Sequence, residues 1–495
     1  MKHLQPEVGE VYSCYVKQLN KYGAYQILSV EKKSICYVVL DYLAETPPTE
    51  EMLSTLTPLH REMYHYHHGI AMTYISNDHV PKDYIYIGTC TPVTDKPCNS
   101  FSGDWDDGLE YVSRARWEAI DEEARAAYKK YINSGEQVKI GNHWYKKNFG
   151  GIRNELYQDL LIGGDIRQLP CITYARVDGY SAELVEFMKA SPMLKTLHLN
   201  NPGAEVIDLR GTYLDDLKLD MTGVAKLYLP KEMEQVDLTG EIRDDLQIDD
   251  SACLQPIALS ISLKKARLQN FGLKKISELR VFDVRKLDMA LVAQYFSDLE
   301  KLGLWGAPGI ITNIAVMEKL QSLRTFIGED IFGYGESEVQ VLEKLPKLNR
   351  LYLKSIPKEA GAYLKKRWKN KLDTLEITRL RDEGWLADNL TNPLRHWDGS
   401  EFIPKAAYKK VFSTYKNTKK LMKEADSKEM IIAVAIEYIK FFNQVNAKYD
   451  EFIETEERED IFAAMEQIYM ECLQHKNFIS IQELFDVMDD ERDDW

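Results

Sequence analysis

The stretch Leu194-Lys195-Thr196-Leu197-His198-Leu199 carries a Leu-x-x-Leu-x-Leu pattern that recurs along the middle of the chain. Complete or degraded copies occupy 214–219, 299–304, 348–353 and 372–377. A repeat of about 20–29 residues with this signature is typical of a leucine-rich-repeat solenoid. Because a solenoid works through an extended concave surface, the pattern favours a binding protein over an enzyme.

The apolar clusters between Leu197 and Leu268 lie only about ten residues apart, which is too close for one repeat each. Two alternating sets resolve this spacing. One set supplies the strands of the concave face and steps by about 20–28 residues. The other set, Ile207, Leu227, Leu246 and Ala266, predicts strands on the opposite side. Later repeats carry helical patterns instead, at 290–296, 315–319, 338–344 and 358–366.

The flanking segments differ in pattern from the repeats. Residues 1–100 are rich in Tyr, Val and Ile and predict a small antiparallel β domain. Residues 101–165 predict a helical connector that caps the solenoid, which spans 166–390. Residues 391–495 have long amphipathic patterns and predict an α-helical domain. The predicted fold class is therefore α+β and multidomain.

Composition limits the classes of function. The net charge of −15 is concentrated at the C-terminal end, where residues 450–495 hold about sixteen acids against three bases. This distribution argues against a nucleic-acid ligand and permits a basic protein partner, but a solvated helix face that aids solubility is the favoured explanation. No apolar run is long enough to span a bilayer, and no secretory signal is visible. Seven scattered cysteines without a Cys-x-x-Cys pair predict a reduced, cytoplasmic protein.

The N-terminal segment resembles the immunity protein 26 family over about 90 residues. That family accompanies bacterial polymorphic toxins, so the resemblance implies a bacterial inhibitor with a toxin as its partner. The motifs that carry it are Gly9-Glu10-Val11-Tyr12, Tyr22-Gly23-Ala24-Tyr25-Gln26-Ile27-Leu28, Leu40-Asp41-Tyr42 with Pro47-Pro48-Thr49, and Tyr84-Ile85-Tyr86-Ile87-Gly88.

The C-terminal segment resembles a group of bacterial leucine-rich-repeat proteins described as molybdate-metabolism regulators or gliding-motility proteins. The resemblance covers about 100 residues and rests on His396-Trp397-Asp398-Gly399 followed by Ile403-Pro404-Lys405-Ala406, together with the helix layout. These descriptions imply no mechanism for this chain.

Few motifs point to catalysis. Phosphate-binding, dinucleotide-binding, nucleophile-elbow and zinc-protease signatures are absent from the sequence. The run from His60 to His68 holds four histidines, so binding of a divalent metal ion remains an alternative, although no cysteine pair lies nearby. Cys36 and Cys253 lack a recognisable nucleophile context and fit buried structural roles better. We therefore predict no catalytic residues, no metal ligands and no cofactor.

The concave face carries the predicted partner site. In a Leu-x-Leu strand the intervening side chains face away from the core, which places Phe282, Trp305 and Phe326 on neighbouring strands. Aromatic and arginine side chains are enriched among interface hot spots. The alternatives are that the C-terminal helices cover these rings, or that a one-residue register error puts them inside. The predicted partner-binding set is Arg280, Phe282, Trp305, Arg324, Phe326, Arg350 and Tyr352.

The sequence thus predicts a non-catalytic protein-binding module. The favoured function is an immunity-type inhibitor that occludes a bacterial toxin by steric and electrostatic complementarity. The first alternative is a leucine-rich-repeat scaffold or regulatory adaptor without a toxin partner. The second is a metal-dependent enzyme that uses the His60–His68 segment of the β domain. Neither nucleic acid nor membrane is expected as a partner.

Overall fold

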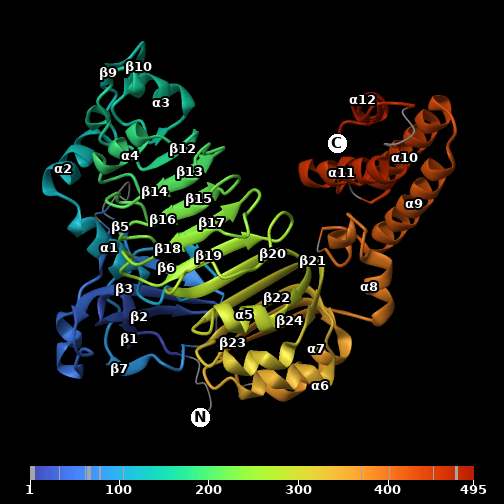
Figure 1. The fold of residues 1–495 in the computed structure, drawn as a ribbon. Helices are drawn as coiled ribbons and strands as arrows, with labels where there is room; N and C mark the ends of the chain where they lie inside the picture. The colour runs from blue at the N-terminus through green and yellow to red at the C-terminus, as the bar shows by residue number, and fades with distance from the viewer. Residues whose placement is uncertain are drawn as a thin grey trace.

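The structure is a computed structural model in which the chain forms four successive parts (Figure 1). These are an N-terminal β sheet, a connector, a large parallel sheet and a helical C-terminal unit. The described residues are 6–32, 34–61, 63, 69–76, 80–103, 105–369, 371–400, 402–449, 451–473 and 478–495. Among them, no helix is both long and apolar enough to cross a bilayer.

The N-terminal sheet has the strand order β7-β1-β2-β3-β6-β8, and its pairs are antiparallel except for β6 with β8. It is apolar on both faces, because Tyr25 and Tyr37 lie in one buried cluster and Val38 and Leu40 in another. The elements are β1 (Glu10–Val16), η1 (Lys17–Leu19), β2 (Lys21–Val30), β3 (Ile35–Ala44), η2 (Glu50–Thr55), β4 (His60–Arg61), β5 (Gly69–Ile70), β6 (Met72–Ile75), β7 (Ile85–Thr89) and β8 (Phe101–Ser102).

The connector begins with α1 (Leu109–Ala119), which belongs to two cores. Tyr111 lies in the core of the N-terminal sheet, where its hydroxyl is 2.7 Å from the Leu40 carbonyl and 2.8 Å from the Ala24 amide. Trp117, two turns later, packs with Cys171 and Met193 beside the large sheet. The remaining elements are α2 (Glu122–Tyr131), β9 (Gln137–Ile140), β10 (His143–Lys146), β11 (Gly151–Ile152), α3 (Asn154–Leu161) and η3 (Ile166–Gln168).

The main unit is an all-parallel sheet of eleven strands within the described part of the chain. Parallel neighbours cannot be joined by tight turns, so each strand is followed by a crossover on one face. The strands, in spatial order, are β11, β12 (Tyr174–Asp178), β13 (Thr196–Asn200), β15 (Asp216–Asp220), β17 (Gln235–Thr239), β19 (Ile257–Ser262), β20 (Ile276–Asp288), β21 (Lys301–Thr312), β22 (Thr325–Phe332), β23 (Arg350–Pro357) and β24 (Thr374–Arg381).

This sheet corrects the predicted fold class. The prediction of an α+β protein built on a leucine-rich-repeat solenoid is wrong, since the fold is mixed α/β around the eleven-stranded parallel sheet. The prediction takes the leucine repeat as sufficient for a solenoid and assigns the flanking segments to separate β and α domains. The structure instead alternates strands with helical crossovers through β20–β24, which is the α/β arrangement.

The crossovers change character along the sheet. Early ones carry short strands that pair into a second parallel sheet, in which Ile207 lies opposite Leu227 and Leu227 opposite Ile248. The prediction is thus confirmed for Ile207 and Leu227, whereas Leu246 lies just before its strand and Ala266 in a loop. The elements are α4 (Ala182–Lys189), β14 (Val206–Asp208), β16 (Lys226–Tyr228), β18 (Gln247–Asp249), α5 (Met289–Tyr295), η4 (Ile314–Lys319), α6 (Glu336–Val339), η5 (Gln340–Lys344) and α7 (Lys358–Trp368).

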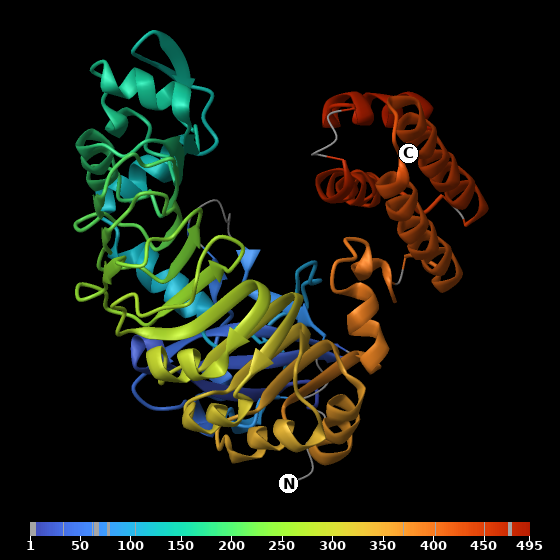
Figure 2. The same ribbon diagram turned by 45° about the vertical axis from the view of Figure 1, so that its right-hand side comes forward.

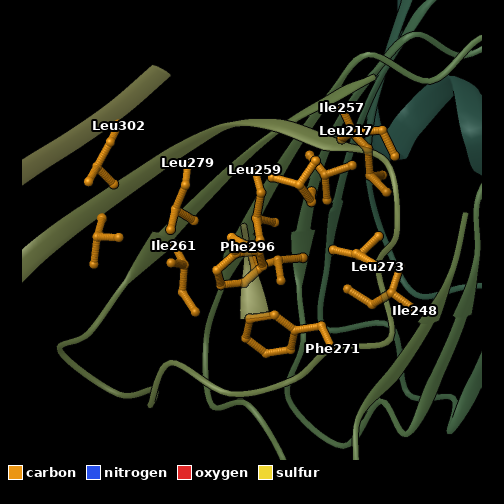
Figure 3. Packing of buried hydrophobic residues seen from close by; sticks show 14 of the residues in the cluster. Leu217, Ile248, Ile257, Leu259, Ile261, Phe271, Leu273, Leu279, Phe296 and Leu302 are labelled. Atoms are coloured by element: carbon orange, nitrogen blue, oxygen red, sulfur yellow. The ribbon is translucent and has the colours of Figure 1, made fainter. Parts of the chain in front are cut away.

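One continuous core joins the sheet to its crossovers. Leu217, Leu259, Leu279 and Leu302 follow one another along the sheet and are fully buried (Figure 3). Phe271 and Phe296, from two crossovers, close the core beneath them. Burial of a leucine side chain contributes roughly 2 kcal/mol, so this row is a major source of stability.

The later strands bend at a row of left-handed residues. Asp330, Ser355 and Arg379 have φ values of 51°, 54° and 50° and occupy equivalent positions on β22, β23 and β24. Each reverses the alternation of the strand, so that Leu353 and Ile356 both face the core across Ser355. The bend lets these strands continue past the point where β12–β17 end.

The helical unit has its own core around Trp397, Tyr438 and Phe442. In Figures 1 and 2 it stands away from β12–β19, beyond the end of the sheet at β24. Arg381 and Trp385 both bind the Asp398 carboxylate, and Asp460 accepts hydrogen bonds from Trp397 and His396. The elements are α8 (Glu383–Asn389), η6 (Arg395–Trp397), α9 (Lys405–Glu424), α10 (Lys428–Lys448), α11 (Thr455–Cys472) and α12 (Ile481–Glu491).

The row of left-handed residues predicts that glycine and valine variants differ in stability with opposite signs at the adjacent positions 378 and 379. At Arg379, the Gly variant should be more stable than the Val variant by about 1–2 kcal/mol, since a side chain at positive φ is strained. At the exposed Thr378 the order should reverse by roughly 0.5–1 kcal/mol, because glycine weakens a strand. Urea unfolding of the four variants measures both differences. The same order at both positions would contradict the bend.

Candidate functional site

The face of the large sheet opposite the core, which we term the free face, shows three columns of side chains. The column at the strand starts passes from Glu278 to Lys301, Thr325 and Arg350. The middle column follows the pairing of Lys218 with Asp237, Asp237 with Ser260, and Ser260 with Arg280. It continues through Gly303, Ile327 and Tyr352 to Glu376. The column nearest the strand ends passes from Ser262 to Phe282, Trp305, Glu329 and Lys354. This register places each predicted site residue.

The predicted set divides into three groups. Arg280, Phe282, Trp305 and Tyr352 lie on the free face, on neighbouring strands, as expected. Phe326 lies in the core. Arg324 and Arg350 lie where β22 and β23 begin, and both face carboxylates of the N-terminal part of the chain.

The predicted position of Phe326 is wrong, because the strand register inferred from the sequence is wrong here. The sequence analysis left a register error open as an alternative. Its ring is 3% exposed and pairs with Leu302 and Leu351 in the core row. The sequence does contain a signal for this register, because Leu323-Arg324-Thr325-Phe326-Ile327-Gly328 fits the repeat with Phe at its fourth position. The predicted site set corresponds to Leu323 at that fourth position, which shifts the strand by three residues and exchanges its faces. Ile327 and Glu329 therefore replace Arg324 and Phe326 on the free face.

The centre of the site is an aromatic stack. The Phe282 and Trp305 rings lie 4.6 Å apart at 16°, and Phe282 is 37% exposed. A Cβ at residue 303 would come within 2.5 Å of the Trp305 ring, so the indole lies over Gly303. The missing side chain is what allows the ring to lie along the sheet and meet Phe282. Since Phe282 remains this exposed, the helical unit does not cover the stack.

The register places Ile327 and Tyr352 on the same face as the stack, on the two strands that follow β21. Ile327 pairs with both Gly303 and Tyr352, and both side chains are half-buried. Phe282, Trp305, Ile327 and Tyr352 thus form an apolar strip across β20–β23. A contiguous apolar strip between polar margins is characteristic of an interaction surface.

Charged groups on both margins of the apolar strip are paired within the sheet. Glu278 binds Arg280 at 2.6 Å and Lys301 at 3.0 Å on one side. Glu329 binds Lys354 at 2.5 Å on the other side. Because these charges are already neutralised, they favour a neutral, apolar contact over a strongly charged one.

Two catalytic alternatives were left by the sequence, a metal site in the His60–His68 segment and a cysteine nucleophile at Cys36 or Cys253. Within the described residues, no group of three His, Cys, Asp or Glu side chains could hold a metal ion, and most of the His60–His68 segment lies outside them. Burial raises the pKa of Cys36 to about 12 and that of Cys253 to about 11. Both thiols are therefore protonated near neutral pH and poor nucleophiles.

The new register predicts very different costs for two phenylalanines. Phe326→Ala should lower the free energy of unfolding by about 3–5 kcal/mol, because it empties a core position. Phe282→Ala should cost about 1 kcal/mol, because it removes an exposed ring and one stacking contact. Denaturant unfolding monitored by circular dichroism measures both. Equal costs, or the reverse order, would restore the original register.

Comparison with known proteins assigns no family. No model of a protein family matches the chain, and a search of curated proteins finds no significant match. The resemblances of residues 9–88 and 396–406 therefore stay predictions. The functional argument rests on the free face and on the residues that pack around it.

Proposed function

We propose that this chain is a non-catalytic protein-binding protein whose partner docks on the apolar strip. The observation that carries the proposal is the exposed stack of Phe282 on Trp305, held over Gly303. Folding gains little from leaving such a ring in water, whereas a partner would bury it. Large aromatic side chains at the centre of a patch are the usual source of binding energy.

The surroundings of the strip support a protein over a small molecule. Four strands contribute one side chain each, so the surface is broad and shallow. The paired charges at its margins resemble the polar rim of an interface. Such a surface has the form of a docking face, not that of a concave ligand pocket.

The edge of the sheet at the starts of β22 and β23, next to the proposed docking face, is in contact with the N-terminal part of the chain. Arg324 and Arg350, which we had predicted to bind the partner, face Asp83 and Asp107 at 3.7 and 3.4 Å. The proposed partner-binding surface therefore comprises the apolar strip and Arg280. Arg324 and Arg350 do not belong to it.

The resemblance to the immunity protein 26 family supports a bacterial toxin as the partner. Inhibition would then consist of occlusion, in which the bound chain blocks the toxin's working surface without any chemistry. A scaffold or adaptor without a toxin partner is the alternative. A metal-dependent activity would have to come from the His60–His68 segment.

Affinity capture with matched variants tests the docking face. Phe282→Ala combined with Trp305→Ala should reduce recovery of the partner from cell extract at least about tenfold, the usual loss when hot-spot rings are removed. Phe402→Ala removes a ring that is 81% exposed in the helical unit and should leave recovery unchanged. Circular dichroism shows that each variant is folded. Equal recovery by the double variant and the unaltered chain would exclude this face.

A second experiment separates a toxin from other partners. The captured protein is expressed alone and together with this chain, and growth of the bacterial host is followed. Arrested growth that is rescued by the unaltered chain, but not by the Phe282→Ala/Trp305→Ala variant, supports toxin occlusion. A captured protein that is harmless to the cell supports the adaptor.

A further inference from the structure

The N-terminal part of the chain lies along one edge of the large sheet, which we term the amino edge. This edge consists of the residues at or just before the start of each parallel strand. Polar contacts reach it from residues 17–18, 82–83, 107 and 116. The contacted residues are Glu234 before β17, Gln255 before β19, Glu300 before β21, Arg324 before β22, Arg350 at the start of β23, and Asp373 before β24.

Each contact at the far end of this edge pairs an acidic side chain with a basic one. On three successive strands, Arg324 faces Asp83 at 3.7 Å, Arg350 faces Asp107 at 3.4 Å, and Asp373 faces Lys82 at 3.2 Å. The Lys82 ammonium also donates to the Lys371 carbonyl at 2.7 Å. Acid meets base at each point, so the two surfaces are complementary in charge.

The N-terminal groups are presented rigidly. Tyr84, which follows Lys82 and Asp83, packs on Tyr25 and Trp105 in the core of the N-terminal sheet. Its hydroxyl donates to Asp107 at 3.1 Å, which links the two acidic contacts. The partners of β22–β24 are therefore held by the core of the N-terminal sheet.

Apolar packing, in contrast, occurs at only one end of the interface within the described residues. Trp117 and Ile120 of the connector cluster with Cys171 and Met193, which precede β12 and β13. The two apolar clusters of the N-terminal sheet share no residue with the core that contains β20–β24. The interface is thus fastened by packing at its near end and by charge at its far end.

We propose that the N-terminal sheet is an electrostatic latch on the amino edge of β21–β24. The pairs of Lys17 with Glu300, Arg324 with Asp83 and Arg350 with Asp107 are partly exposed, so each contributes little and is screened by salt. The apolar packing around Trp117 is not weakened by salt. Raised ionic strength releases the far end while α1 keeps the near end attached. Release separates Arg324 and Arg350 from Asp83 and Asp107, so the latch controls a second, charged surface distinct from the apolar strip.

Zero-length crosslinking of the full chain tests the latch. A carbodiimide joins a lysine to an accessible carboxylate only when they are in contact, and the exposed pair of Lys17 with Glu300 spans the latch. Arg324→Asp should reduce this crosslink roughly two- to fivefold at low salt, since one pair is replaced by a repulsion. Adding Asp83→Arg should restore it. Lys344 with Glu318, 2.6 Å apart within the large unit, is the control crosslink and should not change.

A salt series on the unaltered chain gives a second measurement that needs no variant. Between 0.1 M and 1 M salt, where the screening length falls from about 10 to 3 Å, the Lys17–Glu300 crosslink should fall further than the similarly exposed control crosslink. An equal fall of both crosslinks, or an unchanged Lys17–Glu300 yield in a folded Arg324→Asp variant, would overturn the latch. Neither result affects the proposal for the apolar strip, whose contacts are not ionic.

Discussion

Parallel pairing is the constraint on which the rest of this structure depends. Because each strand of the large sheet runs in the same direction, all strand starts lie at one edge and all strand ends at the other. The crossovers cover one face and leave the other free. The chain therefore has three distinct surfaces to assign: a covered face, a free face and the amino edge. The core, the apolar strip and the latch each use one of them.

The sequence predicted much of the local structure and little of the assembly. The spacing of apolar residues identified the strands around Leu197, Leu217, Leu259 and Leu302, because a half-buried strand imposes a period of two. Apolar residues at three- and four-residue steps predicted the later helical crossovers, because a helix has a period of 3.6 residues. The class of the fold was wrong, because the same leucine spacing is compatible with more than one way of arranging parallel strands.

The candidate site was predicted in part. Phe282 and Trp305 lie where the register placed them, and their stacking depends on Gly303, which no spacing rule singles out. Phe326 was misplaced because two leucines, Leu320 and Leu323, precede it and both are buried in the turn. Arg324 and Arg350 could not be assigned from sequence at all, since their partners Asp83 and Asp107 lie more than 200 residues away. Contacts between distant segments leave no local pattern.

The double membership of α1 bears on the order in which the chain folds during synthesis. Domains generally fold as units, starting from the N-terminus. The N-terminal sheet cannot complete its core until Tyr111 has left the ribosome, because that residue fills the space beside Gly23 and binds the backbone of Ala24 and Leu40. After Tyr111 has emerged and before Met193 is synthesised, the indole of Trp117 lacks this residue, with which it clusters in the finished protein. During synthesis, the completed N-terminal sheet therefore carries α1 with the apolar side chain of Trp117 not yet covered by Cys171 and Met193. This exposed apolar side of α1 is a surface of the kind that chaperones bind.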